Sequence, residues 1–270
     1  LLMGGVHGDE VNGVAIVRDI IKRGYHKPKR GTVICIPVFN VFGYLNLARE
    51  FPDGRDLNRV FPGTANGSLA SQFAHKFTTE IAPLVDYVLD FHTGGGDREN
   101  AAQIRCVLQK GRMLELAKVF GAPFILHSNF IPKSVRETIS KLGKTILLFE
   151  GGKSKALNES IIKYGVEGTV NVMKHLKMLN GEVEQRPSTI IKTSKWIRAP
   201  YSGMLRLKVK NGSFVHQKDV LAVITDSYAE FEKKVLAPCD GHIFCVNTAP
   251  IVNKGDALFN ISLDNVDDID

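Results

Sequence analysis

The 270-residue sequence predicts an α/β domain with a largely parallel or mixed sheet flanked by helices, followed by a small all-β domain. Two patterns support this prediction. Up to about residue 180, short apolar runs alternate with stretches of helical periodicity, and beyond it short strand-like runs are separated by turn residues. The composition, with 44% hydrophobic and 23% charged residues, excludes a disordered or collagen-like chain.

The first part alternates strands and helices along the chain. Strands are expected at 1–6, 32–39, 87–91 and 144–149, and helices at 10–23, 71–84, 111–120 and 158–179. A polar loop with Gly, Pro, Asn and Asp covers about 40–68. In such sheets ligands gather beyond the carboxyl ends of the strands, so polar residues at these ends are candidates for a functional site.

The second part is predicted to be a separate module. Residues 181–194 are expected to link the first domain, 1–180, to an all-β domain at 195–265, with an acidic tail at 266–270. An A-P-x-x-G pattern at 199–203 and 237–241 predicts two copies of one unit, a barrel-sandwich that resembles biotinyl and lipoyl carrier domains. Carriers need a lysine at the turn between the halves. The sequence there is Thr-Asp-Ser-Tyr at 225–228, so no carrier role is expected.

Composition and charge limit the class of protein further. No apolar run is long enough to span a membrane and no secretion leader is visible. The chain opens within an apolar run and without an initiator Met, which predicts that its true N-terminus is missing. Four scattered cysteines favour a reduced, cytoplasmic protein, and the spacing of Cys239 and Cys245 is a poor match to a zinc site. The net charge of +7 favours anionic partners, but no basic stripe interleaved with aromatics indicates nucleic acid.

Three of the expected strand ends carry residues that suit a metal. His7 and Glu10 form an H-x-x-E pattern at a strand-to-helix turn, His92 follows a second strand, and Glu150 follows a third. Two histidines and one glutamate with an open fourth position are typical of catalytic zinc, and a further glutamate supplies the general base. Each residue alone has a plainer interpretation: an acidic first helical turn, a hydrogen-bonded turn histidine, and a solvated glutamate.

The polar loop contains a candidate carboxylate receptor. Its segment 56–63 reads D-L-N-R-V-F-P-G, in which Asn58 offers amide donors and Arg59 a bidentate guanidinium. Arg49 and Arg55 add positive charge nearby. The alternative is that these loop arginines form salt bridges in solvent.

Four motifs in this order, H-G-D-E, D-L-N-R-x-F-P-G, D-F-H-T and F-E-G-G, resemble those of the succinylglutamate desuccinylase/aspartoacylase family, a branch of the zinc carboxypeptidase fold. Many of its members carry a β domain after the catalytic domain. The resemblance implies one Zn²⁺ per chain on His7, Glu10 and His92. It implies further that Glu150 is the general base for metal-activated water and that Asn58 and Arg59 hold the substrate carboxylate.

Three further roles are less closely tied to the motifs. Arg49 resembles the family arginine that polarises the scissile carbonyl. Arg136 is a candidate for binding a second acidic group of the substrate, with a surface salt bridge as the alternative. Alternation along the strand places Asp90 on the face of His92, where it orients the histidine or caps a neighbouring loop.

The sequence therefore predicts a zinc-dependent hydrolase that cleaves the amide bond of an N-acyl amino acid, with a small anionic substrate and no membrane or nucleic-acid partner. Two alternatives remain open: a zinc carboxypeptidase or esterase, and a non-enzymatic binding module with a vestigial zinc site. The β domain could serve as a rim over the metal, as a contact in a homo-oligomer, or as a tether.

Overall fold

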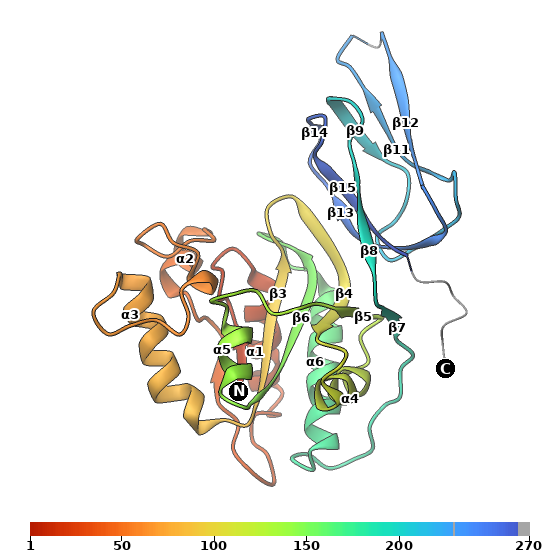
Figure 1. The fold of residues 1–270 in the computed structure, drawn as a ribbon. Helices are drawn as coiled ribbons and strands as arrows, with labels where there is room; N and C mark the ends of the chain where they lie inside the picture. Colours follow the sequence, from red (N-terminus) through yellow and green to blue (C-terminus); the bar gives the residue numbers. More distant parts are fainter. Residues whose placement is uncertain (229, 264–270) are drawn as a thin grey trace.

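The computed structural model describes residues 1–228 and 230–263 and confirms a mixed sheet flanked by helices (Figure 1). The predicted acidic tail at 266–270 lies outside the described residues. The central strands follow the order β2, β1, β3, β6, β4, and β5 and β7 continue from β4. β2, β1, β3 and β6 are parallel, and β4 is antiparallel to β6. Their bounds are Leu2–Gly4 (β1), Cys35–Ile36 (β2), Tyr87–Gly94 (β3), Arg98–Cys106 (β4), Phe124–His127 (β5), Thr145–Lys153 (β6) and Thr189–Ile191 (β7).

Three helices pack side by side against one face of the sheet. They are α1 (Val11–Lys22), α4 (Gly111–Phe120) and α6 (Glu159–His175). Phe91 of β3 and Phe149 of β6 point toward them: the Phe149 ring packs on Phe120 of α4, and a side chain at Gly13 of α1 would collide with the Phe91 carbonyl. Because side chains alternate along a strand, the neighbours of these phenylalanines point to the opposite face, where polar groups are found.

The predicted loop at 40–68 contains helical elements. They are α2 (Val41–Asn46) and a 3₁₀ turn (Leu57–Arg59), and α3 (Leu69–Lys76) follows and continues as a π-helical turn (Phe77–Ile81) and a second 3₁₀ turn (Ala82–Leu84). Side chains of Asn40, Asp56 and Ser68 cap the starts of α2, the first 3₁₀ turn and α3. A cluster of aromatic rings anchors the segment to the sheet: Phe39, Phe51, Phe61, Phe73 and Phe77.

Several strands differ from their predicted bounds. β3 and β6 continue to Gly94 and Lys153, so His92 and Glu150 lie within the carboxyl-terminal parts of strands and not after them. β4, β5 and α5 (Val135–Lys141) are not among the expected elements. β4 buries the polar residues Asn100 and Gln103, so its sequence lacks the apolar pattern on which strand prediction depends.

The C-terminal strands form two layers with the predicted internal repeat. One layer has the order β12, β11, β9, β14, and the other contains β10, β13, β15 and β8. The short strands cross between the repeats: β10 of the first copy pairs with β13, and β14 of the second copy pairs with β9. This exchange is what a pseudo-twofold barrel-sandwich requires. The bounds are Ser194–Arg198 (β8), Gly203–Leu207 (β9), Phe214–Val215 (β10), Val220–Thr225 (β11), Glu232–Leu236 (β12), Gly241–Asn247 (β13), Ile251–Val252 (β14) and Ala257–Ser262 (β15).

Strand β4 joins the two parts of the chain into one sheet. Its first residues pair with β13 of the β domain, with Cys245 opposite Asn100, and its last residues pair with β5. The segment 181–194, predicted as a linker, also supplies β7, which adds to the edge of β5. The β domain is therefore attached through backbone hydrogen bonds as well as through the covalent chain.

Within the described residues, no helix has both the length and the apolar character needed to cross a bilayer. All four cysteines belong to the described part of the chain and are free.

The turn that carries the H-x-x-E pattern depends on a close backbone approach. A Cβ at Gly8 would lie 1.9 Å from the carbonyl carbon of Gly43 in α2, so no larger residue fits without moving the helix. We expect Gly8→Ala to lower the free energy of unfolding by about 2–3 kcal/mol, as overpacking of a close-packed interior does. Gly111→Ala is the matched control, because a Cβ there meets nothing within 4 Å. Equal denaturant midpoints for the two variants would contradict the prediction.

Candidate metal centre and active site

The polar face of the sheet brings together residues from β3 and β6. Asp90 and His92 of β3 lie on the same face, as predicted, and the Asp90 carboxylate contacts the His92 ring. His92 and Glu150 are register partners across β3 and β6. Two neighbouring strands therefore place an imidazole and a carboxylate side by side at one end of the sheet.

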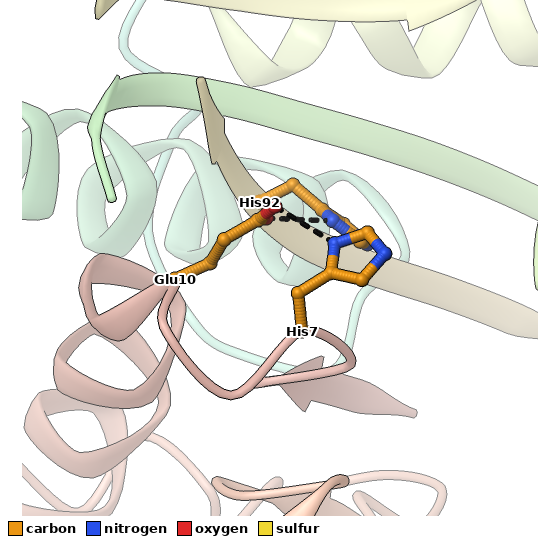
Figure 2. Close-up of side chains that lie close together, drawn as sticks. All are labelled: His7, Glu10 and His92. Atoms are coloured by element: carbon orange, nitrogen blue, oxygen red, sulfur yellow. Dashed lines mark hydrogen bonds and ion pairs between the residues drawn. The ribbon is translucent and has the colours of Figure 1, made fainter. Parts of the chain in front are cut away.

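His7, Glu10 and His92 form a compact buried cluster. His7 lies in the turn after β1, Glu10 immediately precedes α1, and His92 extends from β3, so three elements converge on one point (Figure 2). One potential ligand atom from each residue lies within 4.8 Å of the others. The two oxygens of Glu10 face the two histidines, with Oε1 2.7 Å from His7 Nδ1 and Oε2 2.8 Å from His92 Nδ1. All three residues are at most 4% exposed.

Carboxylates hold the outer nitrogens of both histidines. His7 Nε2 donates to Asp56 Oδ1 at 3.1 Å, and His92 Nε2 donates to Asp90 Oδ2 at 3.1 Å. The Nδ1 atoms are thereby directed inward toward the Glu10 carboxylate. Metal-binding histidines commonly have their second nitrogen bonded to a carboxylate in this way. The donor set of two imidazoles and one carboxylate therefore fits a divalent metal such as zinc.

The charges of the cluster depend on one another. Burial alone would raise the pKa of Glu10, but the facing rings of His7 and His92 outweigh it and hold the pKa well below its usual value. Burial opposes a charged His92, and the carboxylates of Asp90 and Glu10 reverse this and raise its pKa well above that of a free histidine. The pocket thus stabilises a carboxylate that faces positive charge, whether that charge is carried by protons or by a metal ion.

Glu150 has one occupied and one free carboxylate oxygen. Its Oε2 accepts from Asn100 Nδ2 at 2.5 Å and pairs with Arg105 at 3.1 Å, and both donors come from β4. In the described part of the chain, Oε1 has no hydrogen-bond partner. The side chain is 13% exposed and borders the cavity described below, so the free oxygen is available to a bound molecule.

Arg49 lies between the metal cluster and the loop. Its Nε and Nη2 atoms donate to Asp56 Oδ2 at 3.2 and 2.9 Å, and Nη1 lies 3.1 Å from Glu10 Oε1. Burial opposes its charge, but Asp56 and Glu10 outweigh this and raise its pKa. The structure therefore places Arg49 beside the ligand cluster, and its role toward a substrate carbonyl stays a prediction.

The D-L-N-R segment faces the same space. The Asn58 side-chain oxygen accepts from the backbone of Val135 at 2.9 Å, which ties the loop to the start of α5. Its Nδ2 has no acceptor among the described residues. Arg59 is exposed and donates only to the Asn58 carbonyl. Both residues thus retain donors for a ligand, and a solvent salt bridge of Arg59 is absent from the described residues.

Arg136 is buried, which excludes the surface salt bridge that was the alternative prediction. It is 5% exposed, and its guanidinium donates to the carbonyls of Arg105, Ser128 and Asn129. Burial, reinforced by the nearby charge of Arg105, lowers its pKa to about 10. Its role in substrate binding stays a prediction.

These residues line a cavity of about 500 Å³, a size suited to a small molecule. The lining contains His7, Glu10 and His92, five arginines and two further acids, Asp90 and Glu150. The arginines are Arg49, Arg59, Arg98, Arg105 and Arg136. The β domain closes one side with Trp196 and Cys245, and the Arg98 guanidinium packs 5.6 Å from the centre of the Trp196 ring.

Three of the site residues were not singled out by sequence reasoning. Asp56 stands within the quoted D-L-N-R motif but received no role, although its position two residues before Asn58 could have suggested a cap. Asn100 and Arg105 lie on β4, which the apolar pattern does not reveal. Only the pairing of β4 with β6 brings them to Glu150.

Comparisons with known proteins identify the family of the chain. The succinylglutamate desuccinylase/aspartoacylase catalytic domain matches residues 1–176. An N-alpha-acetyl-L-2,4-diaminobutyric acid deacetylase of Halomonas elongata is 30% identical over 278 residues, which cover 96% of this chain and 80% of that protein.

Solved structures show the same fold. A succinylglutamate desuccinylase/aspartoacylase from Rhodobacter sphaeroides is 25% identical with a TM-score of 0.85, covering 97% of this chain and 85% of that one. The product-bound ectoine utilization protein EutE (DoeB) of Ruegeria pomeroyi also has a TM-score of 0.85, at 20% identity, covering 97% and 84%. The family and the deacetylase relative indicate a hydrolase that removes acyl groups from N-acyl amino acids. The predicted resemblance is thus confirmed: the chain belongs to the succinylglutamate desuccinylase/aspartoacylase family.

Proposed function

We propose that the protein is a zinc-dependent deacylase that hydrolyses the amide bond of a small N-acyl amino acid. One observation carries the proposal. The inward-facing His7, Glu10 and His92 lie in the same cavity as a glutamate with a free oxygen and a loop with free carboxylate donors. This is the set of groups that amide hydrolysis needs.

His7, Glu10 and His92 would hold one zinc ion. When bound, zinc supplies Lewis acidity toward a carbonyl oxygen and lowers the pKa of water at an open coordination position. The carboxylates of the half-buried Asp56 and the buried Asp90 would keep the two histidines oriented for this purpose.

Glu150 is the proton carrier in this proposal. Its free Oε1 would take a proton from the attacking water and return it to the leaving amine, while Asn100 and Arg105 hold the other oxygen in place. Arg49, beside the metal cluster, would donate to the carbonyl oxygen as negative charge develops on it. Asn58 and Arg59 would bind the carboxylate of the amino acid with their free donors.

The shape of the cavity favours a small substrate over a peptide. A peptidase must let the chain extend away from the metal, whereas Trp196 and Cys245 of the β domain form a wall here. The non-enzymatic alternative has less support, because the proposed ligands, base and carboxylate receptor are all present in one cavity.

Charge in the cavity points to a substrate with a second anionic group. In the described part of the chain, Arg59, Arg98 and Arg136 line the cavity without a carboxylate within 4.0 Å. The carboxylate of the amino acid is assigned to Asn58 and Arg59, which leaves Arg98 and Arg136 without an anionic partner among the described residues. We therefore propose that a second acid, on the side chain or the acyl group, approaches Arg136, whose buried cation gains most from an anion.

Two variants should distinguish loss of the metal from loss of catalysis. We expect His92→Ala to lose stoichiometric zinc, measured by elemental analysis of the dialysed protein. Glu150→Gln should keep the metal but lose about 10²–10⁴-fold in kcat, because the general base is removed. The assay is amine release from N-acetyl and N-succinyl amino acids, with short peptides alongside. Turnover of peptides alone would contradict the deacylase proposal, and unchanged activity of Glu150→Gln would contradict the role of the base.

The charge of the preferred substrate is a second prediction. We expect kcat/KM to be about 10–100-fold higher for N-acetylaspartate or an N-succinyl amino acid than for N-acetyl-leucine, because hydrogen bonds to charged groups contribute about 1.5–3 kcal/mol. Nα-acetyl-diaminobutyrate, with its cationic side chain, should be the poorest of the four. In Arg136→Lys the preference should shrink, while Arg112→Lys, at a surface ion pair outside the cavity lining, should keep it. A preference for the diaminobutyrate derivative would overturn this proposal without touching the deacylase chemistry.

A further inference from the structure

The Asp56 carboxylate contacts three different parts of the site: His7, Arg49 and the backbone of Asn58. Its Oδ1 accepts from His7 Nε2 at 3.1 Å and from the backbone of Asn58 at 2.8 Å. Its Oδ2 accepts from two nitrogens of Arg49. We infer that Asp56 is a positioning residue that couples a metal ligand, the carbonyl-polarising arginine and the carboxylate receptor through one carboxylate. The inference rests on the proposed metal site.

The contact with His7 determines which nitrogen faces the metal. A carboxylate oxygen can only accept, so Nε2 must carry a hydrogen and Nδ1 is left for the interior of the cluster. The rest of the His7 environment supplies no second outward acceptor in the described part of the chain. Without Asp56 the ring would lose the group that fixes its orientation.

The contact with Arg49 keeps that cation from occupying the metal cluster. Arg49 Nη1 already lies 3.1 Å from Glu10 Oε1 and 3.2 Å from His7 Nδ1, two atoms that would ligate the proposed metal. Two hydrogen bonds to Asp56 hold the other edge of the guanidinium and neutralise its charge. If Asp56 were neutral, Arg49 would compete with the metal for Glu10, and its positive charge would repel the metal ion.

The contact with Asn58 shapes the carboxylate receptor. Asp56 begins the 3₁₀ turn Leu57–Arg59 by accepting from the Asn58 backbone, so the turn that presents both receptor side chains starts at the same carboxylate. The Asp56 side chain is 24% exposed, which leaves its charge only partly screened by solvent. One residue thus sets the distance between the metal cluster and the substrate carboxylate.

The test is zinc affinity, measured by competition with a chromophoric chelator. We expect Asp56→Asn to weaken zinc binding about 10–100-fold, the usual effect of removing a carboxylate behind a metal-binding histidine. Asp53→Asn is the matched control: Asp53 lies on the same loop and accepts from the backbones of Arg55 and Ala70, but it contacts no residue of the cluster. Its zinc affinity should equal that of the wild type.

A double variant separates positioning from loss of folding. Because Arg49 competes for Glu10 once Asp56 is neutral, Arg49→Met should restore about tenfold of the zinc affinity lost in Asp56→Asn. A loop that had merely unfolded would not be rescued by a second truncation. Equal zinc affinity in Asp56→Asn and wild type, or no rescue in the double variant, would overturn the inference. A wild-type protein that binds no zinc would overturn the proposed function together with it.

Discussion

The site is built around one buried negative charge, the carboxylate of Glu10. A charge removed from water needs several partners, and Glu10 has four: the two imidazoles, Arg49, and the backbone N–H of Thr93, which donates to Oε2 at 2.9 Å. These partners come from the turn after β1, from the loop before the D-L-N-R motif and from β3. The burial of a single carboxylate therefore requires that three distant segments of the chain meet at one end of the sheet.

Two further carboxylates lie behind the histidines that contact Glu10. Asp56 and Asp90 stand behind the histidines, and each bonds the nitrogen that the cluster does not use. Alternation along β3 explains Asp90, since residues two apart share a face. Asp56 arrives by a different route, through the capped 3₁₀ turn of the loop. The arrangement gives each histidine a fixed orientation before any ligand is bound.

Much of this architecture can be predicted from the sequence. The prediction fails for the elements whose position depends on pairing between strands that are distant in the sequence. His7, Glu10 and His92 could be grouped because strand ends of a parallel sheet meet at one edge, and the four ordered motifs identified the family. Strand β4 could not be found, because its buried Asn100 and Gln103 break the apolar pattern. For the same reason the environment of Glu150 was unknown: its two partners lie on β4. The predicted alternative for Arg136, a surface salt bridge, was wrong. The sequence of a short helix does not show that the guanidinium of an arginine will be buried against backbone carbonyls.

The sharing of β4 also limits what the β domain can do. A tether or swinging arm must move, but β13 pairs with the first residues of β4, and the later residues of the same strand pair with β6 beside Glu150. Cys245 lies opposite Asn100, the residue that donates to Glu150, so the β domain is one hydrogen-bonded strand away from the proposed base. Thr248 further bonds the carbonyl of Asp97 in the turn that follows His92. Displacing the domain would break the pairing of β13 with Arg98, Glu99 and Asn100 of β4, the strand that supplies both hydrogen-bond partners of Glu150. The β domain is thus joined to the catalytic domain by strand pairing, and it contributes Trp196 and Cys245 to the cavity wall.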